Sequence, residues 1–197
     1  IHGVAIEYAD LHSILDAFAH YFHNGQITYE AFVDGVAYGG REYVEHPETF
    51  GVPERNVAYV QSTRKPVDDI IAFLSEHEEE LDSLDIVAAD TALYQKIEEQ
   101  IPLVTKSVYT TSAVSYRLEI SHKNSGKATG LAYVLKLLDI TPEETVAFGD
   151  GDNDAEMLEF AGLGVAMENA TENCKAAADI VCDCCKNDGV ARFLYGF

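Results

Sequence analysis

The stretch Val146-Ala147-Phe148-Gly149-Asp150-Gly151-Asp152-Asn153-Asp154-Ala155-Glu156-Met157-Leu158 decides the fold of this 197-residue chain. A short apolar run ends in a carboxylate cluster bracketed by glycines, and the cluster opens onto a helical pattern. This pattern predicts a strand, a tight loop and a helix N-terminus. In open α/β sheets, ligand sites lie at the carboxyl ends of strands in this setting.

Asp150, Asp152 and Asp154 stand within five residues and repel one another. They are tolerable when solvated or when a cation neutralises them, and oxygen ligands alone point to a hard cation such as Mg²⁺. A solvated acidic turn that caps the next helix is the plain alternative. A calcium loop of the D-x-D-x-D type is excluded, because Ala155 stands where its glycine belongs and Ala161 where its bidentate glutamate belongs.

The composition is strongly acidic, with 13 basic against 34 acidic residues and a net charge of −21. Such a field repels nucleic acid and anionic membranes, so neither is an expected partner. It also repels a phosphorylated substrate, unless a cation or a lysine reverses the sign locally. An apolar fraction of 47% supports a real core, and the length fits one large or two small domains. No apolar run is long enough to span a bilayer.

The four cysteines are Cys174, Cys182, Cys184 and Cys185. Three of them lie within four residues, which is a poor arrangement for a disulfide framework. Reduced thiols and a cytoplasmic protein are therefore the favoured interpretation. A soft-metal site is the alternative, but the chain lacks two well-spaced C-x₂-C pairs.

Residues 1–120 predict a mixed α+β unit with a mainly antiparallel sheet. Apolar alternation and turn residues such as Asp34-Gly35 predict strands and a hairpin, while apolar positions at helical spacing predict the helices. The expected strands cover 1–6, 27–33, 36–38, 57–60 (or the start of a long loop), 84–88, 103–109 and 115–120. The expected helices cover 11–22 and 92–101, and a third begins at Pro66 and continues as a solvated face over 76–80.

Residues 121–197 have a different character. The polar, turn-rich stretch 121–126 is a plausible boundary, and strand and helix then alternate strictly. Expected strands cover 145–148, 163–167 and 180–182. Helices are expected from Lys127, after the acidic loop as far as Gly162, around 174–178 and over 189–194. Strict alternation predicts a parallel sheet with right-handed crossovers, and hence two domains, 1–120 and 121–197.

Lys127 lies at an expected helix start, where backbone N–H groups and the helix dipole already favour an anion. If two parallel strands bring this helix to the acidic loop, the pocket holds a cation, a lysine and free N–H donors. That combination suits a phosphate bridged to Mg²⁺. A lone lysine at a helix start is otherwise simply solvated.

Several segments together resemble the haloacid dehalogenase superfamily phosphatases, and most closely their Cof-type subgroup. Gly149–Leu158 with Ala161–Ala170 is similar to the fourth motif and following strand of that family. Ser125–Ala128 resembles the third motif, and Asn187–Ala191 the closing segment. The resemblance is dense over 117–197, and 1–116 resembles the family's cap by pattern. It implies a Rossmannoid parallel-sheet core with an α+β cap.

The resemblance also implies roles for individual residues. Asp150 would be the direct Mg²⁺ ligand from this loop, and Asp154 would support the metal directly or through water. Asn153 would contact the phosphate or substrate. Lys127 would be catalytic, holding the phosphate and the nucleophile. Family members hydrolyse phosphate monoesters through an aspartyl-phosphate. The resemblance therefore implies a Mg²⁺-dependent phosphatase of small phosphorylated metabolites such as sugar phosphates.

One family motif is missing. The chain contains no D-x-D-G-T, and its only D-x-D pairs lie in the loop 150–154. In the family the first two motifs precede the cap, so a chain that opens at Ile1 is expected to be a C-terminal fragment, inactive alone. The strand at 145–148 would then be an unpaired apolar edge prone to self-association. The alternative is a natural non-catalytic binding or regulatory module. Phosphotransfer of the mutase type is disfavoured, because those members carry a longer insertion in this motif.

Substrate specificity is expected in the cap. Tyr29, Tyr38, Arg41 and Arg64 are candidate contacts there, although each is also a plausible surface or sheet residue.

Overall fold

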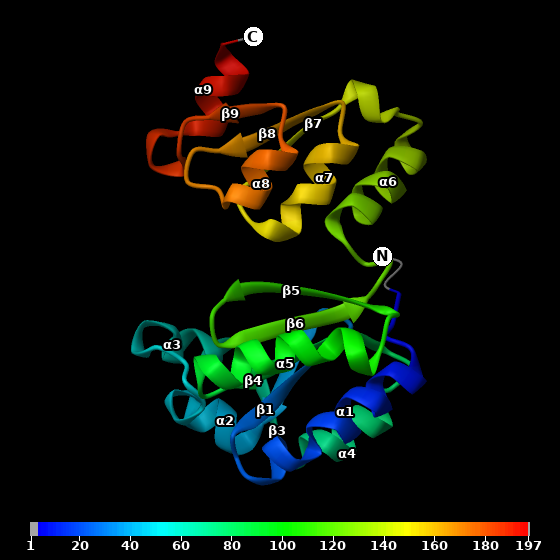
Figure 1. Cartoon of the computed structure of the whole chain (residues 1–197), viewed down its shortest axis with the longest axis vertical. Coiled ribbons are helices and arrows are strands. Elements are labelled where there is room, and N and C mark those ends of the chain that lie inside the picture. Colours follow the sequence, from blue (N-terminus) through cyan, green and yellow to red (C-terminus); the bar gives the residue numbers. More distant parts are fainter. Residues whose placement is uncertain (1–3, 197) are drawn as a thin grey trace. The chain divides into compact units, whose positions relative to one another are not determined.

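The computed structural model describes residues 4–196, and the chain divides into two compact units, 1–123 and 124–197 (Figure 1). The first unit is built on a six-stranded sheet in the order β3-β2-β1-β4-β6-β5. Only β2 and β3 run parallel, so the expectation of a mainly antiparallel sheet is confirmed. Its elements are α1 (Tyr8–His23), β1 (Ile27–Val33), β2 (Val36–Gly40), α2 (Arg41–Glu45), η1 (Pro47–Phe50), α3 (Glu54–Thr63), β3 (Arg64–Val67), α4 (Ile70–Glu76), β4 (Leu81–Ala88), α5 (Thr91–Val104), β5 (Val108–Val114) and β6 (Arg117–His122).

The hairpin of β1 and β2 turns at Asp34 and Gly35. Both have positive φ, 50° and 73°, and Val33 pairs with Val36 across the turn. Two successive left-handed residues give the tight turn whose twist matches antiparallel strands, so the Asp-Gly prediction is confirmed.

The two faces of this sheet are buried differently. Alternate residues such as Tyr29 and Ala31 pack into a core with residues of α1, α4 and α5. The opposite face carries Glu30 and Val87, and residues of α2, η1 and α3 cover part of it, including Tyr43. Both faces are therefore partly covered, and the face that carries Glu30 contains buried charged side chains.

Three expectations for the first unit are wrong. Residues 57–60 are not a strand but part of α3. Pro66 does not begin a helix: it lies in β3, and the helix starts after Asp69, whose carboxylate accepts the N–H groups of Ile71 and Ala72. β3 is an edge strand, where a proline is tolerated. The helix ends at Glu76 and does not continue over 76–80, where the chain turns and the Glu80 N–H donates to the His77 carbonyl at 2.9 Å.

Two more boundaries differ from the expectation. α5 extends to Val104, and β5 begins only at Val108. The expected strand over 1–6 lies partly on residues 1–3, outside the described residues. Residues 4–6 form no strand, although the Ile6 N–H donates to the Leu81 carbonyl at 3.0 Å.

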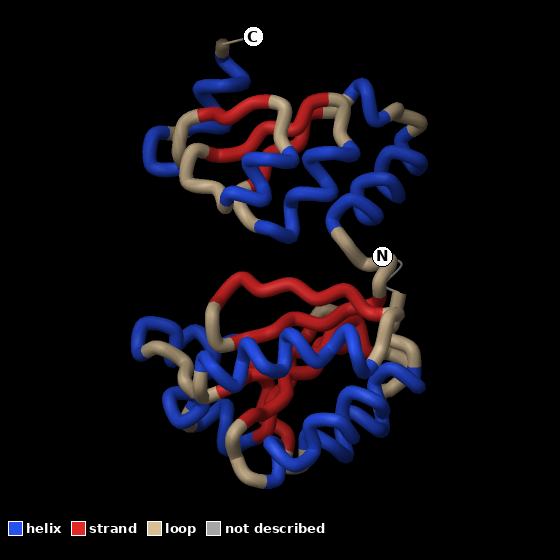
Figure 2. Tube along the Cα trace, viewed as in Figure 1, coloured by secondary structure: helices blue, strands red, loops and turns tan. Residues whose placement is uncertain are grey.

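The second unit is a three-stranded parallel sheet in the order β7-β8-β9, which confirms the predicted α/β alternation (Figure 2). α7 and α8 contact β7 and β8, while Phe193 of α9 meets Phe148 edge-on with ring centroids 5.5 Å apart. Thr141 and Glu144 form a capping box at the start of η2. Its elements are α6 (Lys127–Leu138), η2 (Pro142–Glu144), β7 (Val146–Gly149), η3 (Asp152–Asp154), α7 (Ala155–Phe160), β8 (Leu163–Met167), α8 (Glu172–Ala177), β9 (Ile180–Cys182), η4 (Cys185–Asn187) and α9 (Gly189–Tyr195).

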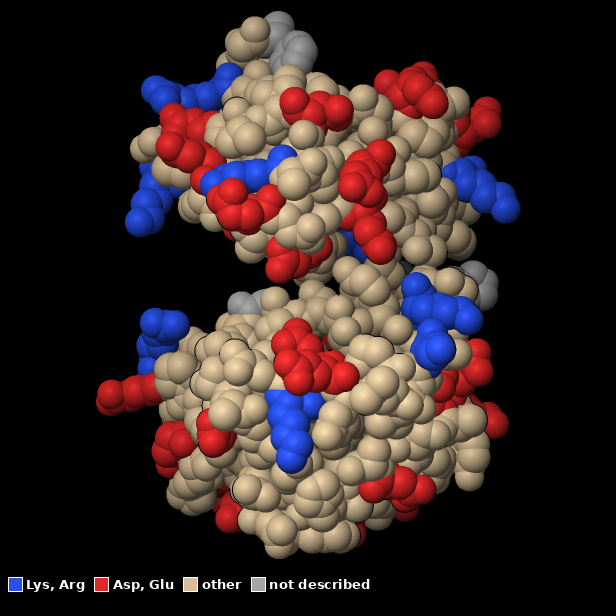
Figure 3. Space-filling view, viewed as in Figure 1, with Lys and Arg blue, Asp and Glu red and all other residues tan. Residues whose placement is uncertain are grey.

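Acidic side chains are scattered over the visible face of each unit, with lysines and arginines among them (Figure 3). The net charge of −21 is thus not gathered into one patch on that face. Within the described part of the chain, no helix has the length and apolar character needed to cross a membrane.

Candidate active site

The acidic loop follows β7, as the sequence predicts. Parallel pairing sets Gly149, the last residue of β7, opposite Ala166 of β8, so the segments after the two strands emerge side by side. A Cβ on Gly149 would lie 2.4 Å from the Cβ of Asp154. Only glycine therefore lets the loop fold back far enough to place Asp154 beneath it.

Asp154 organises the loop from inside. The residue is 4% exposed, and its Oδ2 accepts hydrogen bonds from the backbone N–H of Asp150 (2.9 Å) and of Gly151 (3.0 Å). Its Oδ1 pairs with the ammonium of Lys127, at the N-terminus of α6. Burial alone would raise the pKa of this carboxyl, but Lys127 and the two N–H groups outweigh it and hold the pKa below its ordinary value.

Asp150 presents its side chain outward. Its backbone carbonyl accepts the N–H of Thr171 at 3.0 Å, which fixes the main chain. Its carboxylate is exposed and, from the residues that the structure describes, accepts only a long hydrogen bond, 3.4 Å, from the amide of Asn169. The Asp150 carboxylate therefore keeps lone pairs available for a cation.

Asp152 and Asn153 complete the loop within η3. Asp152 accepts a 2.5 Å hydrogen bond from the Thr171 hydroxyl, which also accepts the N–H of Cys174 as the N-cap of α8. The Asn153 amide makes no hydrogen bond among the described residues. It is thus free to contact a ligand, while Asp152 ties the loop to α8.

These donors fit a hard cation held by oxygen atoms. Asp150 offers an exposed carboxylate that is engaged only by the long hydrogen bond from Asn169 among the described residues. Both oxygens of Asp154 are already occupied by three donors, so a direct bond from Asp154 to a metal would have to displace one of them. Of the two modes of metal support expected for Asp154, direct or through water, its occupied oxygens favour the one through water.

Asn169 and Thr171 are the functional-site residues that sequence reasoning missed. Both follow β8, the neighbour of β7, and both bind the acidic loop. A signal was present, because the carboxyl ends of adjacent parallel strands meet at one edge of a sheet. Applying that rule to β8 as well as to β7 would have found them.

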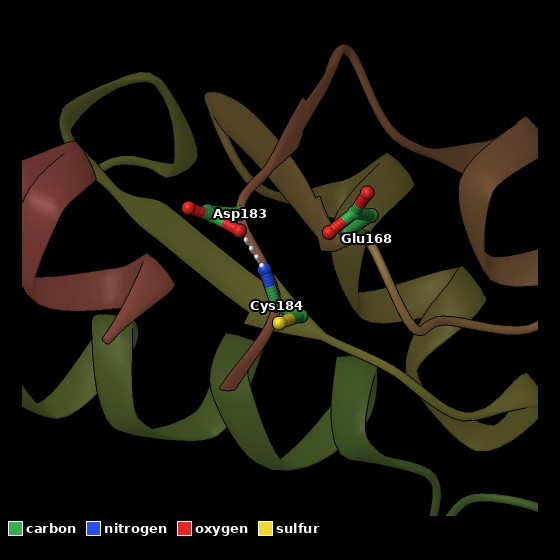
Figure 4. Close-up of side chains that lie close together, drawn as sticks. All are labelled: Glu168, Asp183 and Cys184. Carbon is green, nitrogen blue, oxygen red and sulfur yellow. Dashed lines mark hydrogen bonds between the residues drawn. The ribbon is translucent and has the colours of Figure 1, made fainter. Parts of the chain in front are cut away.

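A second group of possible metal ligands lies at the end of β9, where one ligand atom each from Glu168, Asp183 and Cys184 all fall within 4.8 Å of one another (Figure 4). Asp183 is engaged there as an acceptor. It binds the N–H of Cys184 and the amide of Asn187, each at 2.8 Å, and the guanidinium of Arg192 at 2.9 Å. These bonds give Asp183 the role of holding the C-terminal turn.

The cysteines form no disulfide: all four are free. Cys174 and Cys182 are buried, and burial raises the pKa of both thiols. Cys182 packs its sulfur 3.5 Å from that of Met167, as a small apolar side chain would.

The expected specificity residues have varied surroundings. Tyr29 lies in β1 and is 0% exposed within the core, so the alternative of a sheet residue is confirmed and not the substrate contact. Tyr38 packs against Phe73 with ring centroids 4.5 Å apart. Arg41 makes an exposed ion pair with Asp68 at 2.7 Å, and Arg64 is buried.

A profile of the haloacid dehalogenase-like hydrolases matches residues 4–194 of this sequence. The chain belongs to that family. It is 50% identical over 80 residues to a phosphoglycolate phosphatase of Methanopyrus kandleri, a match that covers 41% of this chain and 34% of that protein. The resemblance read from the motifs, and the α/β fold class it implied, are thereby confirmed.

Solved structures share the fold. A phosphatase of this superfamily from Bacteroides thetaiotaomicron superposes with a TM-score of 0.74 at 24% identity, covering 100% of this chain and 66% of that one. A subclass IIB sugar phosphatase superposes with a TM-score of 0.70 at 18% identity, covering 98% and 68%. This haloacid dehalogenase-like chain thus spans about two thirds of those structures, and its match spans about a third of the Methanopyrus enzyme.

Proposed function

We propose that the protein to which this sequence belongs is a Mg²⁺-dependent phosphomonoester hydrolase of the Cof type. One observation carries the proposal: Lys127, at the N-terminus of α6, reaches the same loop from which Asp150 points outward. A cationic ammonium and an available carboxylate on one loop suit a phosphate and its metal ion. They also offset the repulsion that a net charge of −21 exerts on such a substrate.

Each residue has a defined task in this proposal. Asp150 holds the Mg²⁺, which when bound neutralises charge on the phosphoryl oxygens. Lys127 is the catalytic lysine and binds the phosphoryl group. Asp154 orients Lys127 and the loop backbone, and the free amide of Asn153 contacts the phosphate or the rest of the substrate.

We propose small phosphorylated metabolites, sugar phosphates among them, as substrates, in keeping with the sugar phosphatase that shares the fold. Residues 1–120 would form the cap and 121–197 part of the core. The four free thiols support a reducing, cytoplasmic setting.

The 197 residues contain no D-x-D-G-T motif that could supply the nucleophile of an aspartyl-phosphate mechanism. We therefore propose that this polypeptide alone does not turn over a phosphomonoester. Phosphate release by this chain with Mg²⁺ and p-nitrophenyl phosphate tests this. Release that Asp150→Ala abolishes would contradict it.

The metal site has its own test. Calorimetry with Mg²⁺ should show weak binding that Asp150→Asn removes, while Glu159→Gln, which changes an exposed carboxylate on α7, leaves it intact. Equal binding by Asp150→Asn and the unchanged chain would overturn the assignment.

Activity is tested on the complete protein. A panel of sugar phosphates should be hydrolysed, and Lys127→Ala should lower kcat by about a hundredfold to a thousandfold, the usual cost of removing one transition-state donor. Binding of phosphorylated metabolites without any turnover by the complete protein would instead support the non-catalytic module.

The edge of the second sheet supports self-association. β7 pairs only with β8 among residues 4–196, and Val146 is 45% exposed. Leu137 and Leu138 of α6 are 67% and 60% exposed. We propose that a second copy pairs at β7. Light scattering across a concentration series should show dimers that Val146→Lys abolishes and Val181→Lys, on β9, does not. A monomer at every concentration contradicts the proposal.

A further inference from the structure

The first unit has a cavity of about 610 Å³ at one end of its sheet, where β1 begins and β2 ends. Ile27 and Thr28, the first two residues of β1, point to opposite faces of the sheet, and both line this cavity. The cavity therefore wraps around the end of the sheet and does not lie on one face. Its volume falls in the range of about 300–1,000 Å³ that is usual for small-molecule sites.

The floor of the cavity is buried and mostly apolar. Ile27 and Tyr43 are each 1% exposed, and Ile70, the first residue of α4, is 3% exposed. The Tyr43 hydroxyl already donates to Glu30 at 2.5 Å, so Tyr43 offers a ligand no free donor. This floor suits the apolar body of a ligand, whose burial against it is favourable.

One polar group in the floor lacks a partner. Thr28 is 4% exposed, and its hydroxyl makes no hydrogen bond among the described residues. Gly40 leaves room beside it, because a Cβ on Gly40 would lie 4.0 Å from Oγ1 of Thr28 and 3.9 Å from Cγ2 of Ile70. Buried hydroxyl groups are normally hydrogen-bonded, so a partner for Thr28 has to enter through the cavity.

The rim of the cavity is acidic. Four exposed carboxylates line it, those of Glu42, Glu45, Asp68 and Asp69, against the single guanidinium of Arg41. That guanidinium is already paired, since Nε (2.8 Å) and Nη2 (2.7 Å) both bind Asp68. The Glu42 side chain makes no hydrogen bond or ion pair within the described part of the chain. An anion is therefore repelled at the rim, and a cation is attracted.

Burial decides which end of a ligand goes where. An ammonium group on the uncharged floor would lose its water without gaining an opposite charge, which is costly. At the rim it keeps water and faces carboxylates. A hydroxyl at the other end of the ligand can exchange a hydrogen bond with Thr28, because both groups donate and accept.

We propose that this cavity binds a small organic cation, with its ammonium at the acidic rim, its apolar body on the floor and a hydroxyl bonded to Thr28. The inference goes beyond the proposed hydrolysis, and it does not depend on phosphate, Mg²⁺ or turnover. Binding of an amine therefore stands or falls separately from phosphatase activity.

The direct test is a titration of the unchanged chain with tyramine, followed by NMR of methyl groups at constant ionic strength. The signals of Thr28 and Ile70 should shift saturably, while that of Val165, buried in the other unit, should stay in place. 4-Ethylphenol, which lacks the ammonium, should bind at least tenfold more weakly. Absence of a saturable shift at Thr28 and Ile70, or equal binding of 4-ethylphenol, overturns the proposal.

The hydroxyl contact is tested by a pair of variants and a pair of ligands. Thr28→Val keeps the shape of the side chain and should weaken tyramine binding about tenfold, the cost of one good hydrogen bond. Phenethylamine lacks the hydroxyl, so its affinity should not fall in Thr28→Val. Thr110→Val on β5, at the far edge of the sheet, is the matched control and should bind tyramine normally. Equal loss of both ligands in Thr28→Val would refute the contact.

The acidic rim is tested by removing one charge. Glu42→Gln should weaken tyramine binding about threefold, as expected for an exposed ion pair, and leave 4-ethylphenol unaffected. Glu99→Gln, at an exposed position of α5, removes the same charge away from the cavity and should have no such effect. Circular dichroism verifies that each variant folds. If Glu99→Gln weakened tyramine binding as much as Glu42→Gln, the overall charge and not this rim would attract the amine, which would contradict the proposed site.

Discussion

Lys127 and Asp154 form an ion pair that ties the start of α6 to the acidic loop. The lysine side chain is 48% exposed, whereas that of the aspartate is 6% exposed. The same aspartate also accepts two backbone N–H groups of its own loop. Asp154 therefore has two roles: it shapes the loop through the backbone N–H groups, and it holds the half-exposed ammonium of Lys127 against that loop.

Replacing Asp154 should lower the stability of the second unit. Asp154→Asn removes the charge that Lys127 and the two N–H groups bind, so we expect a loss of about 1–3 kcal/mol in unfolding free energy. Urea unfolding measures it. Glu159→Gln, an exposed carboxylate on α7, is the control and should change stability little. If Asp154→Asn unfolds like Glu159→Gln, the loop does not depend on this carboxylate.

Gly149 should be intolerant of a methyl group. Gly149→Ala places a Cβ 2.4 Å from the Cβ of Asp154, so the loop must shift, and we expect destabilisation of about 1–3 kcal/mol. Gly130→Ala is the matched control in α6, because its Cβ meets nothing within 4 Å. That change should stabilise the helix by about 0.5–1 kcal/mol. Thermal unfolding of the pair gives opposite signs, and a stabilising Gly149→Ala would show that the loop relaxes freely.

Prediction from sequence succeeded where the signals are local. β8 and β9 begin and end where the apolar runs do, and the Asp-Gly turn sits at the hairpin. It failed where the structure depends on contacts between residues far apart in the sequence. Arg64 opens β3, which pairs with β2, and its guanidinium binds Glu30, 34 residues earlier. The local pattern of apolar residues does not predict the contact between Arg64 and Glu30.

The candidate site divides in the same way. Lys127, Asp150, Asn153 and Asp154 stand in motifs that are contiguous in sequence, so they could be named in advance. Thr171 could not be read from its own neighbours, because its role depends on the pairing of β7 with β8.

The buried hydroxyl of Tyr29 should add nothing to the stability of the chain. The side chain is 0% exposed, its oxygen has no hydrogen-bond partner among the described residues, and burial raises the pKa of the phenol. Tyr29→Phe removes an unsatisfied buried polar group at nearly constant shape, so it should be neutral or stabilise the chain by about 1 kcal/mol. Tyr43→Phe is the contrast, since that hydroxyl donates to Glu30 at 2.5 Å, and it should destabilise. Calorimetric unfolding of both variants measures these changes in stability. A clear loss from Tyr29→Phe would reveal a partner for the hydroxyl, such as a buried water.

The C-terminal turn should weaken in acid through Asp183. Hydrogen bonds from Asn187 and the Cys184 N–H, together with the Arg192 guanidinium, hold the pKa of Asp183 below its ordinary value. A carboxyl whose folded pKa is lowered adds stability that is fully present above its unfolded pKa, about 3.9, and is lost as pH falls through the folded pKa. Amide protection of α9, corrected for the intrinsic exchange rate, should therefore drop over that acid range. Asp183→Asn should lower the protection at neutral pH and flatten its acid dependence, whereas Glu172→Gln on α8 should leave both unchanged. If Asp183→Asn lost as much α9 protection in acid as the unchanged chain, the titrating group would be a residue other than Asp183.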